Sequence, residues 1–233
     1  MNHTAESSIR IQVLGLFGLV VGGAPIELPL QAQRVLGYLA VIQPVQSRSA
    51  LAGCLWGDMP QNRAMAALRN ALWQLRKVPA PVIRTSRDKV SMDPSVRTDL
   101  ANVRSCAATI ASGGPQDTEF LAIDLFDCDL LTAWEEDWLC IERERCRQMR
   151  IHTLESLAEL LTRQGRHAQA IQAALAAVRA EPLRETAQVI LIKAHLSEGN
   201  TCEAIRQFEA FRILLADELG LQPSPRVKAL MHK

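Results

Sequence analysis

A spacing of 34 residues in the second half of the chain strongly restricts its fold. Gly165 and Gly199 lie 34 residues apart, and so do Ala170 and Ala204. A glycine permits a tight turn between two helices, and a small alanine lets paired helices cross closely. The spacing therefore predicts repeated pairs of antiparallel helices in this half of the molecule.

Other residues of this half support the same prediction. Ala158, Ala177 and Pro182 stand where tetratricopeptide repeats place small residues and a terminating proline, whereas the second repeat has Ala216 in place of the proline. Such helices stack into arrays that present a groove to a peptide or a protein. We therefore expect an all-α domain of tetratricopeptide-like repeats over residues 96–233.

Two helices are expected before the repeats. One starts at Val96 and stops at Gly113-Gly114-Pro115, and the other runs from Trp134 to about Leu161. The second helix contains the run Glu142-Arg143-Glu144-Arg145. Because opposite charges three and four residues apart stabilise a helix, we expect this run on a solvent-exposed face.

The first 95 residues combine two hydrophobic periods. Ile9, Ile11 and Val13 alternate with their neighbours, as in a strand, and Gly22-Gly23 can reverse the chain toward a further strand at residues 26–28. From residue 31 the period becomes helical. The expected elements are helices from Gln31 to Pro44, from an N-cap at Ser49 to Gly57 and from about Gln61 to Lys77, followed by a β-hairpin at residues 82–92. This order predicts an α+β winged helix-turn-helix domain over residues 1–95, with the boundary near residues 93–99.

The charge of the chain is unevenly distributed. The net charge of +1 is the sum of +6 over residues 1–90 and −5 over residues 91–233. Residues 61–89 alone contain seven basic side chains and one acid, Asp88. Such asymmetry favours a polyanion-binding unit joined to an interaction unit, although a cluster of charges on a solvated face is the simpler alternative.

The third helix and the hairpin are the candidate nucleic-acid contacts. The helix turns Ala64, Leu68, Ala71, Leu72 and Leu75 toward one side, which predicts its core face. Arginine can pair with guanine and asparagine or glutamine with adenine, so its other side suits a major groove. The predicted DNA-binding residues are Asn62, Arg63, Ala66, Arg69, Asn70, Trp73, Gln74 and Lys77 on this helix and Arg84, Arg87 and Lys89 on the hairpin. A contact of Trp73 with DNA and its packing against another part of the protein both remain open.

Several segments of the chain resemble the SARP-type regulators, which join an OmpR-like winged helix to a bacterial transcriptional activator domain. The resemblance covers roughly residues 9–231. It rests on residues 55–58 and 67–77 in the first half, and on residues 136–139, 142–145, 180–185, 194–200 and 218–225 in the second. The hairpin departs from the family, because Ser86-Arg87-Asp88-Lys89 replaces the Gly-Gly-Tyr-like turn of its relatives.

The resemblance implies a sequence-specific transcriptional regulator, an activator that binds promoter repeats. It implies double-stranded DNA, RNA polymerase and a second copy of the chain on DNA as partners. The alternative is a protein-interaction module that uses its winged helix for assembly rather than for DNA binding.

Other classes of protein find little support in the sequence. The six cysteines include no C-x-x-C pair and the five histidines are scattered, so we expect no metal, no other cofactor and no enzymatic activity. The longest apolar run, from Leu14 to Ala24, is too short to span a bilayer, and the N-terminus does not resemble a signal peptide. We therefore expect a cytoplasmic protein without membrane contact.

Overall fold

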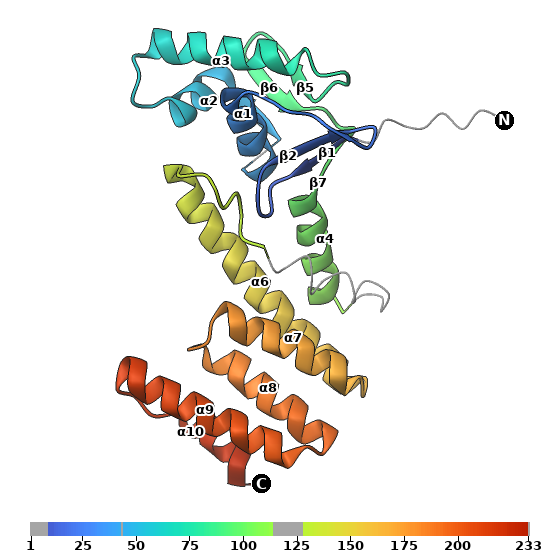
Figure 1. Ribbon diagram of the computed structural model, residues 1–233, viewed down its shortest axis with the longest axis vertical. Coiled ribbons are helices and arrows are strands. Elements are labelled where there is room, and N and C mark those ends of the chain that lie inside the picture. The colour runs from blue at the N-terminus through green and yellow to red at the C-terminus, as the bar shows by residue number, and fades with distance from the viewer. Residues whose placement is uncertain (1–8, 43, 114–127, 233) are drawn as a thin grey trace, which may run out of the picture. The chain divides into compact units, whose positions relative to one another are not determined.

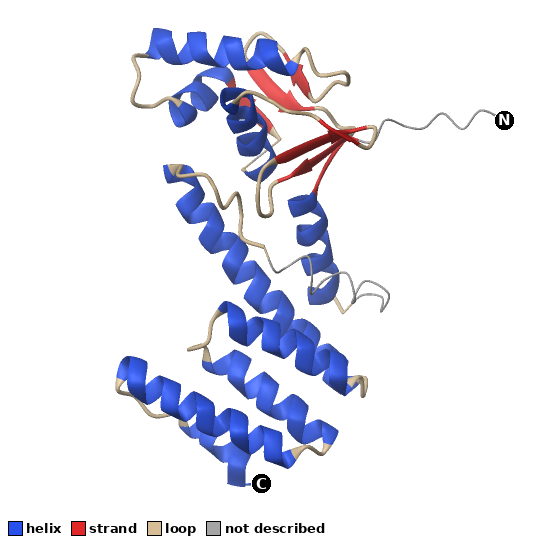
Figure 2. Ribbon diagram, in the orientation of Figure 1, coloured by secondary structure: helices blue, strands red, loops and turns tan. Residues whose placement is uncertain are grey.

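The computed structural model describes residues 9–42, 44–113 and 128–232. These residues form two compact units, one containing 9–104 and 128–144 and the other containing 105–113 and 145–232. The first unit holds the strands and helices α1 to α3, whereas the second is helical (Figures 1 and 2). The predicted fold class, a winged helix-turn-helix followed by an all-α domain, is confirmed.

The first unit contains a four-stranded sheet with the strand order β3-β2-β1-β7. β1 (Ile9–Gln12) and β2 (Gly18–Val21) are antiparallel, with Ile9 opposite Val21. Gly22 and Gly23 both adopt positive φ, so the chain turns tightly and pairing resumes at once in β3 (Ala24–Pro25). The third strand therefore lies before the predicted residues 26–28, of which only Ile26 donates a further bond to the Leu19 carbonyl.

The fourth strand of this sheet was not predicted. β7 (Val96–Thr98) lies parallel to β1, with Ile9 opposite Val96, where we expected the start of a helix. Helix α4 (Asp99–Ala111) begins only after this strand, because the Thr98 hydroxyl accepts the Ala101 N–H as an N-cap does. Asp99 then accepts the N–H groups of Val13 and Leu14, which fastens the helix start to the sheet.

Three helices and a small second sheet form the winged helix-turn-helix. The helices are α1 (Leu30–Val41), α2 (Arg48–Leu55) and α3 (Gln61–Leu75), and the sheet has the order β4-β6-β5, with β4 at Val45–Ser47, β5 at Ile83–Thr85 and β6 at Lys89–Met92. The N-cap of α2 is Ser47 and not Ser49, since the Ser47 hydroxyl accepts the Ala50 N–H. Ser47 ends the unpredicted strand β4, so its capping role depends on a pairing remote in sequence.

Residues 128–144 also belong to the first unit. The Trp134 ring stacks on Phe17 and touches Gly37, and Glu136 accepts hydrogen bonds from Arg34 at 2.5 and 2.9 Å. Arg143 donates to the main-chain carbonyls of this segment, those of Leu130, Leu131 and Trp134. The units therefore do not divide at a single cut between residues 95 and 96, because contacts remote in sequence add this segment to the first unit.

Helix α6 (Asp137–Arg163) contains the charged run expected on a solvent face. Glu142 is instead buried, and Arg143 is half-buried against the carbonyl groups of residues 130–134. The expectation of a solvent-exposed run is therefore wrong for these two residues. The polar groups of residues 130–134 need partners, and the alternation of charges along the helix could not reveal this.

The second unit contains the predicted helix pairs. α6 is followed by α7 (His167–Ala180), and α8 (Glu185–Glu198) is followed by α9 (Thr201–Leu219), α10 (Pro225–Lys228) and a 3₁₀ turn (Ala229–His232). Gly165 and Gly199 have φ of 73° and 87°, as their turns require, and the alanines five residues later are fully buried. Val189, Ile192, Ala204, Phe211, Leu215 and Val227 form a core cluster of this unit. No helix among the described residues is long and apolar enough to cross a membrane.

Candidate nucleic-acid interface

Helix α3 has one buried side and one open side. Its buried residues are Ala64, Leu68, Ala71, Leu72 and Leu75, the five that the helical period predicts. They pack against α1 and α2, and the helix lies at the surface of the unit (Figure 1). The prediction of the core face is thus confirmed, and the opposite side of α3 is free to meet a ligand.

The predicted DNA-binding residues of this helix lie on that open side. Asn62, Arg63, Ala66, Arg69, Asn70, Trp73 and Lys77 are exposed, and Gln74 is half-buried. The helix ends at Leu75, two residues earlier than predicted, and Lys77 continues the turn by donating its N–H to the Gln74 carbonyl. The structure therefore collects these eight side chains along one helix and the turn that follows it.

Trp73 carries the largest apolar surface on this side and is 53% exposed. The Lys77 ammonium lies 3.2 Å from the centroid of its ring, a cation–π contact. The pair places a positive charge beside an exposed flat ring, and both groups suit contact with a nucleic acid.

The wing, defined here as residues 83–92, carries the other three predicted residues. Arg84, Arg87 and Lys89 are all exposed. Arg84 donates to the Asp93 carboxylate at 2.8 Å, whereas no hydrogen bond or ion pair within the described parts of the chain engages the side chains of Arg87 and Lys89. The wing tip therefore offers two open cations, and the base of the wing offers one that is already paired.

Asp93 is strongly acidic in this setting. The backbone N–H of Ser95 and then its hydroxyl donate to one carboxylate oxygen, and Arg84 donates to the other, so the pKa of Asp93 falls from 3.8 to about 2. The carboxylate is thus charged at neutral pH and holds Arg84 at the base of the wing.

Sequence reasoning missed two arginines that contact the wing. Arg76, just after α3, donates to the Thr85 hydroxyl at 2.7 Å. Arg48, the first residue of α2, donates its backbone N–H to the Asp88 carbonyl and its guanidinium to the Ser86 carbonyl. Arg76 lies in the basic stretch of residues 61–89 and Arg48 lies outside it, so composition alone does not reveal that both contact the wing.

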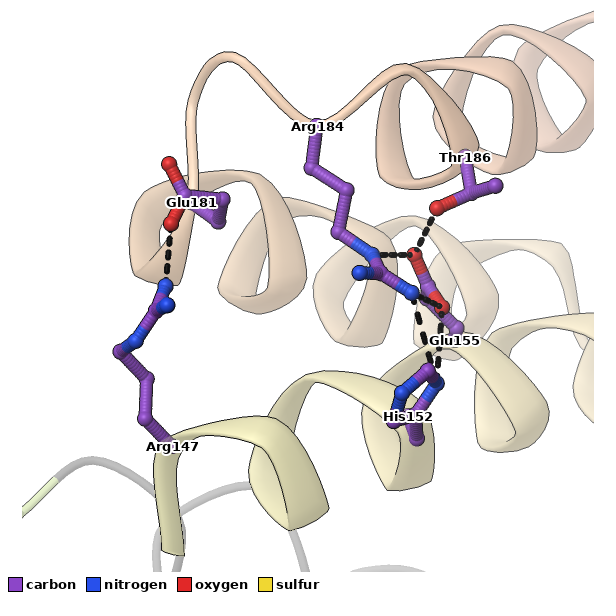
Figure 3. A network of polar contacts seen from close by, with 6 residues as sticks. All are labelled: Arg147, His152, Glu155, Glu181, Arg184 and Thr186. Atoms are coloured by element: carbon purple, nitrogen blue, oxygen red, sulfur yellow. Dashed lines mark hydrogen bonds and ion pairs between the residues drawn. The ribbon is translucent and has the colours of Figure 1, made fainter. Parts of the chain in front are cut away.

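The second unit has its own polar network, on the segment that resembles the activator domain. Arg184 donates two hydrogen bonds to Glu155 of α6, Thr186 donates a third, and Glu181 pairs with Arg147 (Figure 3). Burial disfavours the charged form of Glu155, but the hydrogen bonds from Arg184 and Thr186 outweigh it and hold its pKa below the usual value. These contacts fasten the turn between α7 and α8 to α6.

The described residues contain no candidate metal centre. Within residues 9–42, 44–113 and 128–232, no group of three or more histidine, cysteine, aspartate or glutamate side chains is arranged to hold an ion.

Comparison with known proteins relates the sequence to a family of regulators. Residues 101–233, more than half of the chain, match the family described as bacterial transcriptional activator domain. The chain is 30% identical over 245 residues to the regulatory protein AfsR of Streptomyces coelicolor, and 27% identical over 205 residues to the regulatory protein DnrI of Streptomyces peucetius. These alignments cover 98% and 78% of this chain.

The relatives differ in length from this chain. It spans 24% of the Streptomyces coelicolor AfsR and 25% of the AfsR of Streptomyces griseus, but 75% of DnrI. This chain thus corresponds to about a quarter of either AfsR protein.

A solved structure shares the fold. The structure of Mycobacterium tuberculosis EmbR in complex with low affinity phosphopeptide superimposes with a TM-score of 0.73 at 20% identity, over 97% of this chain and 65% of EmbR. The likeness shows the same winged-helix and helical architecture. With the family match and the curated relatives, it follows that this chain belongs to the SARP-type transcriptional regulators, the family that carries the bacterial transcriptional activator domain.

Proposed function

We propose that this regulator binds double-stranded DNA with sequence preference, using the outer side of α3 and the wing. The observation that carries the proposal is the division of α3 into a fully buried apolar side and an exposed polar side. A helix of 15 residues is about 22 Å long, which suits a major groove.

Each exposed side chain has a chemical role in this proposal. Arg69 can donate two hydrogen bonds to guanine, and Asn70 can exchange two with adenine. The small side chain of Ala66 lets the helix backbone approach the base edges. Arg87 and Lys89, open at the wing tip, suit the phosphates of the adjoining backbone.

The proposal extends to the partners that the family resemblance implies. Bound at promoter repeats as a homodimer, the regulator contacts RNA polymerase and activates transcription. The second unit, with its helical repeats, is the part that suits a protein contact.

In vitro selection from a random duplex library, followed by binding titrations over a range of salt concentrations, tests the DNA-binding proposal. Arg69→Ala and Asn70→Ala should each reduce discrimination between selected and random duplexes by about 1–3 kcal/mol. The double variant Arg87→Ala/Lys89→Ala should weaken binding to all sequences alike and lower the slope of log affinity against log salt by about 2.

Arg97→Ala is the matched control, because Arg97 is an exposed arginine on β7 of the four-stranded sheet. It should leave affinity and salt dependence unchanged. Equal affinity of the parent and of the variants with fewer charges on α3 and the wing would contradict DNA binding through this surface.

The alternative function is assembly with other proteins through the winged helix and the repeats. Exposed apolar side chains on the second unit, Leu175, Ile205 and Ile213, favour some protein contact there. A stable protein complex without promoter enrichment in chromatin immunoprecipitation would support this alternative over DNA binding.

A further inference from the structure

The wing is joined by hydrogen bonds to both helices of the helix-turn-helix. At the C-terminal end of α3, the guanidinium of the C-cap residue Arg76 donates to the Thr85 hydroxyl at 2.7 Å. From α2, the backbone N–H of Arg48 donates to the Asp88 carbonyl at 2.8 Å, and its side chain donates to the Ser86 carbonyl at 3.1 Å. The first N–H groups of a helix have no acceptor within the helix, and the Asp88 carbonyl at the wing tip accepts one of them, that of Arg48.

These contacts divide the basic residues of the region into two groups. Arg48, Arg76 and Arg84 donate to the wing itself or to Asp93 at its base. The side chains of Arg87 and Lys89, by contrast, make no hydrogen bond or ion pair within the described parts of the first unit. Arg76 and Arg84 are exposed, as are Arg87 and Lys89, so their contacts and not their exposure separate the two groups.

We propose that Arg76 is a positioning residue, which holds the wing at a set orientation to α3 through Thr85 so that both elements meet DNA as one body. The proposal rests on the proposed DNA-binding function. It assigns Arg76 a role distinct from that of Arg69 or Arg87, since its guanidinium acts on another part of the protein rather than on DNA.

Preorganisation is the physical reason why such a contact matters for binding. If the wing moved freely, DNA would have to order it on binding, and the lost conformational entropy would weaken the complex. Once α3 lies in the major groove, a wing already held beside it is at a high effective concentration near the DNA phosphates. Pro79 and Pro81, in the loop between Arg76 and Thr85, also restrict the connection.

The decisive variant is Thr85→Val, which removes the acceptor for Arg76 without changing any charge. Valine keeps the shape and the strand preference of threonine, so β5 should remain folded. We expect Thr85→Val to weaken binding to parent-selected duplexes by roughly three- to tenfold, the range of one hydrogen bond. Thr85→Ser, which restores a hydroxyl, should bind as the parent does.

A second readout does not depend on DNA. Hydrogen exchange at the wing amides of Ser86 and Lys89, which donate to the Lys89 carbonyl and the Ser86 hydroxyl, should become faster in Thr85→Val. Ser91→Ala is the matched control, because it removes a hydroxyl from the neighbouring strand whose contact, 3.5 Å to the Arg84 carbonyl, stays within the wing. It should change neither affinity nor exchange at Ser86 and Lys89.

The double variant separates positioning from direct contact. If Arg76 acts through Thr85, Arg76→Ala/Thr85→Val binds no more weakly than Arg76→Ala. If Arg76 instead contacts a DNA phosphate directly, Arg76→Ala should lower the slope of log affinity against log salt by about 1, and Thr85→Val should bind like the parent. This result would overturn the proposal. If selection enriches no duplex, the proposed function fails, and the exchange measurement decides alone: faster exchange supports the Arg76–Thr85 attachment, and unchanged exchange overturns it.

Discussion

Asp93 shows what one side chain does at the base of the wing. It accepts two hydrogen bonds from Ser95 and one from Arg84, and its own N–H donates to the Val82 carbonyl. The residue therefore fixes where the hairpin leaves the rest of the first unit. Because three donors favour its charged form, its contribution to stability depends on pH.

The first prediction concerns this pH dependence. The folded-state pKa of about 2 lies below the ordinary value of 3.8, so the stabilisation is present above about pH 4 and is lost as the pH falls toward about 2. Asp93→Asn should remove this contribution to the pH dependence of the stability of the first unit. The measurement is the midpoint of urea unfolding at several pH values between about 4 and 2. Ser95→Ala should retain some of it, since the Ser95 backbone N–H still donates, and an unchanged profile in Asp93→Asn would contradict the assignment.

The second prediction compares a buried ion pair with an exposed one. Glu155→Gln removes the negative charge and one of the two oxygens that accept from Arg184, whose side chain is 25% exposed. It should lower the free energy of unfolding of the second unit by roughly 2 kcal/mol. Glu203→Gln removes an ion pair of the same length from Arg206, which is 76% exposed, and should cost less than about 0.5 kcal/mol. Denaturant titration measures both, and equal effects would contradict the role of burial.

At the scale of the element, the effect of a residue in a helix depends on what that part of the helix packs against. Gly37 in α1 faces the Trp134 ring, and an added Cβ would lie 2.7 Å from it. Gly53 in α2 is exposed, with nothing within 4 Å of an added Cβ. The two glycines have the same helical propensity but opposite surroundings.

The third prediction follows from this contrast. Gly53→Ala should stabilise the first unit by up to about 1 kcal/mol, because alanine loses less backbone entropy in a helix. Gly37→Ala should destabilise it by about 1–3 kcal/mol in spite of that gain, since the stacked Trp134 ring must move. Thermal unfolding of the two variants tests the difference in sign, and stabilisation by both substitutions would show that Trp134 can shift freely.

At the scale of the whole molecule, the first unit is discontinuous in sequence. Residues 128–144 contribute Trp134, the Glu136 partner of Arg34, and the ring of Trp138, which packs edge-on against Tyr38. Burial and then a hydrogen bond to Cys54 raise the pKa of the half-buried Tyr38 to about 12. A first unit cut at residue 95 lacks the contacts of Trp134, Glu136 and Trp138.

The fourth prediction tests this discontinuity. A fragment of residues 1–95 loses Asp99, β7 and Trp134, and should be less stable than a fragment of residues 1–144 by roughly 5 kcal/mol. That is comparable to the whole stability of a small domain, so the shorter fragment should be largely unfolded. Circular dichroism during urea titration measures the difference. Equal cooperative transitions would show that residues 96–144 are dispensable to the fold.

Much of the architecture could be predicted because it depends on local spacing. The buried side of α3, the hairpin, and the helix pairs turning at Gly165 and Gly199 follow from periods of two, 3.6 and 34 residues. Periodicity also places Arg69 and Asn70 on the exposed side of a helix, although it does not test what they bind.

The strands β4 and β7, the Ser47 cap and the buried Glu142 could not be predicted in the same way. Each depends on a partner distant in the chain, such as β6 for β4 and β1 for β7, and short polar segments carry no periodic signal for such pairing. The same reason applies to the arginines in and around the wing, because Arg48, Arg76 and Arg87 share one chemistry in the sequence. Their separate surroundings arise only when α2, α3 and the hairpin fold together, because a hydrogen bond is defined by the positions of both partners and not by the identity of one.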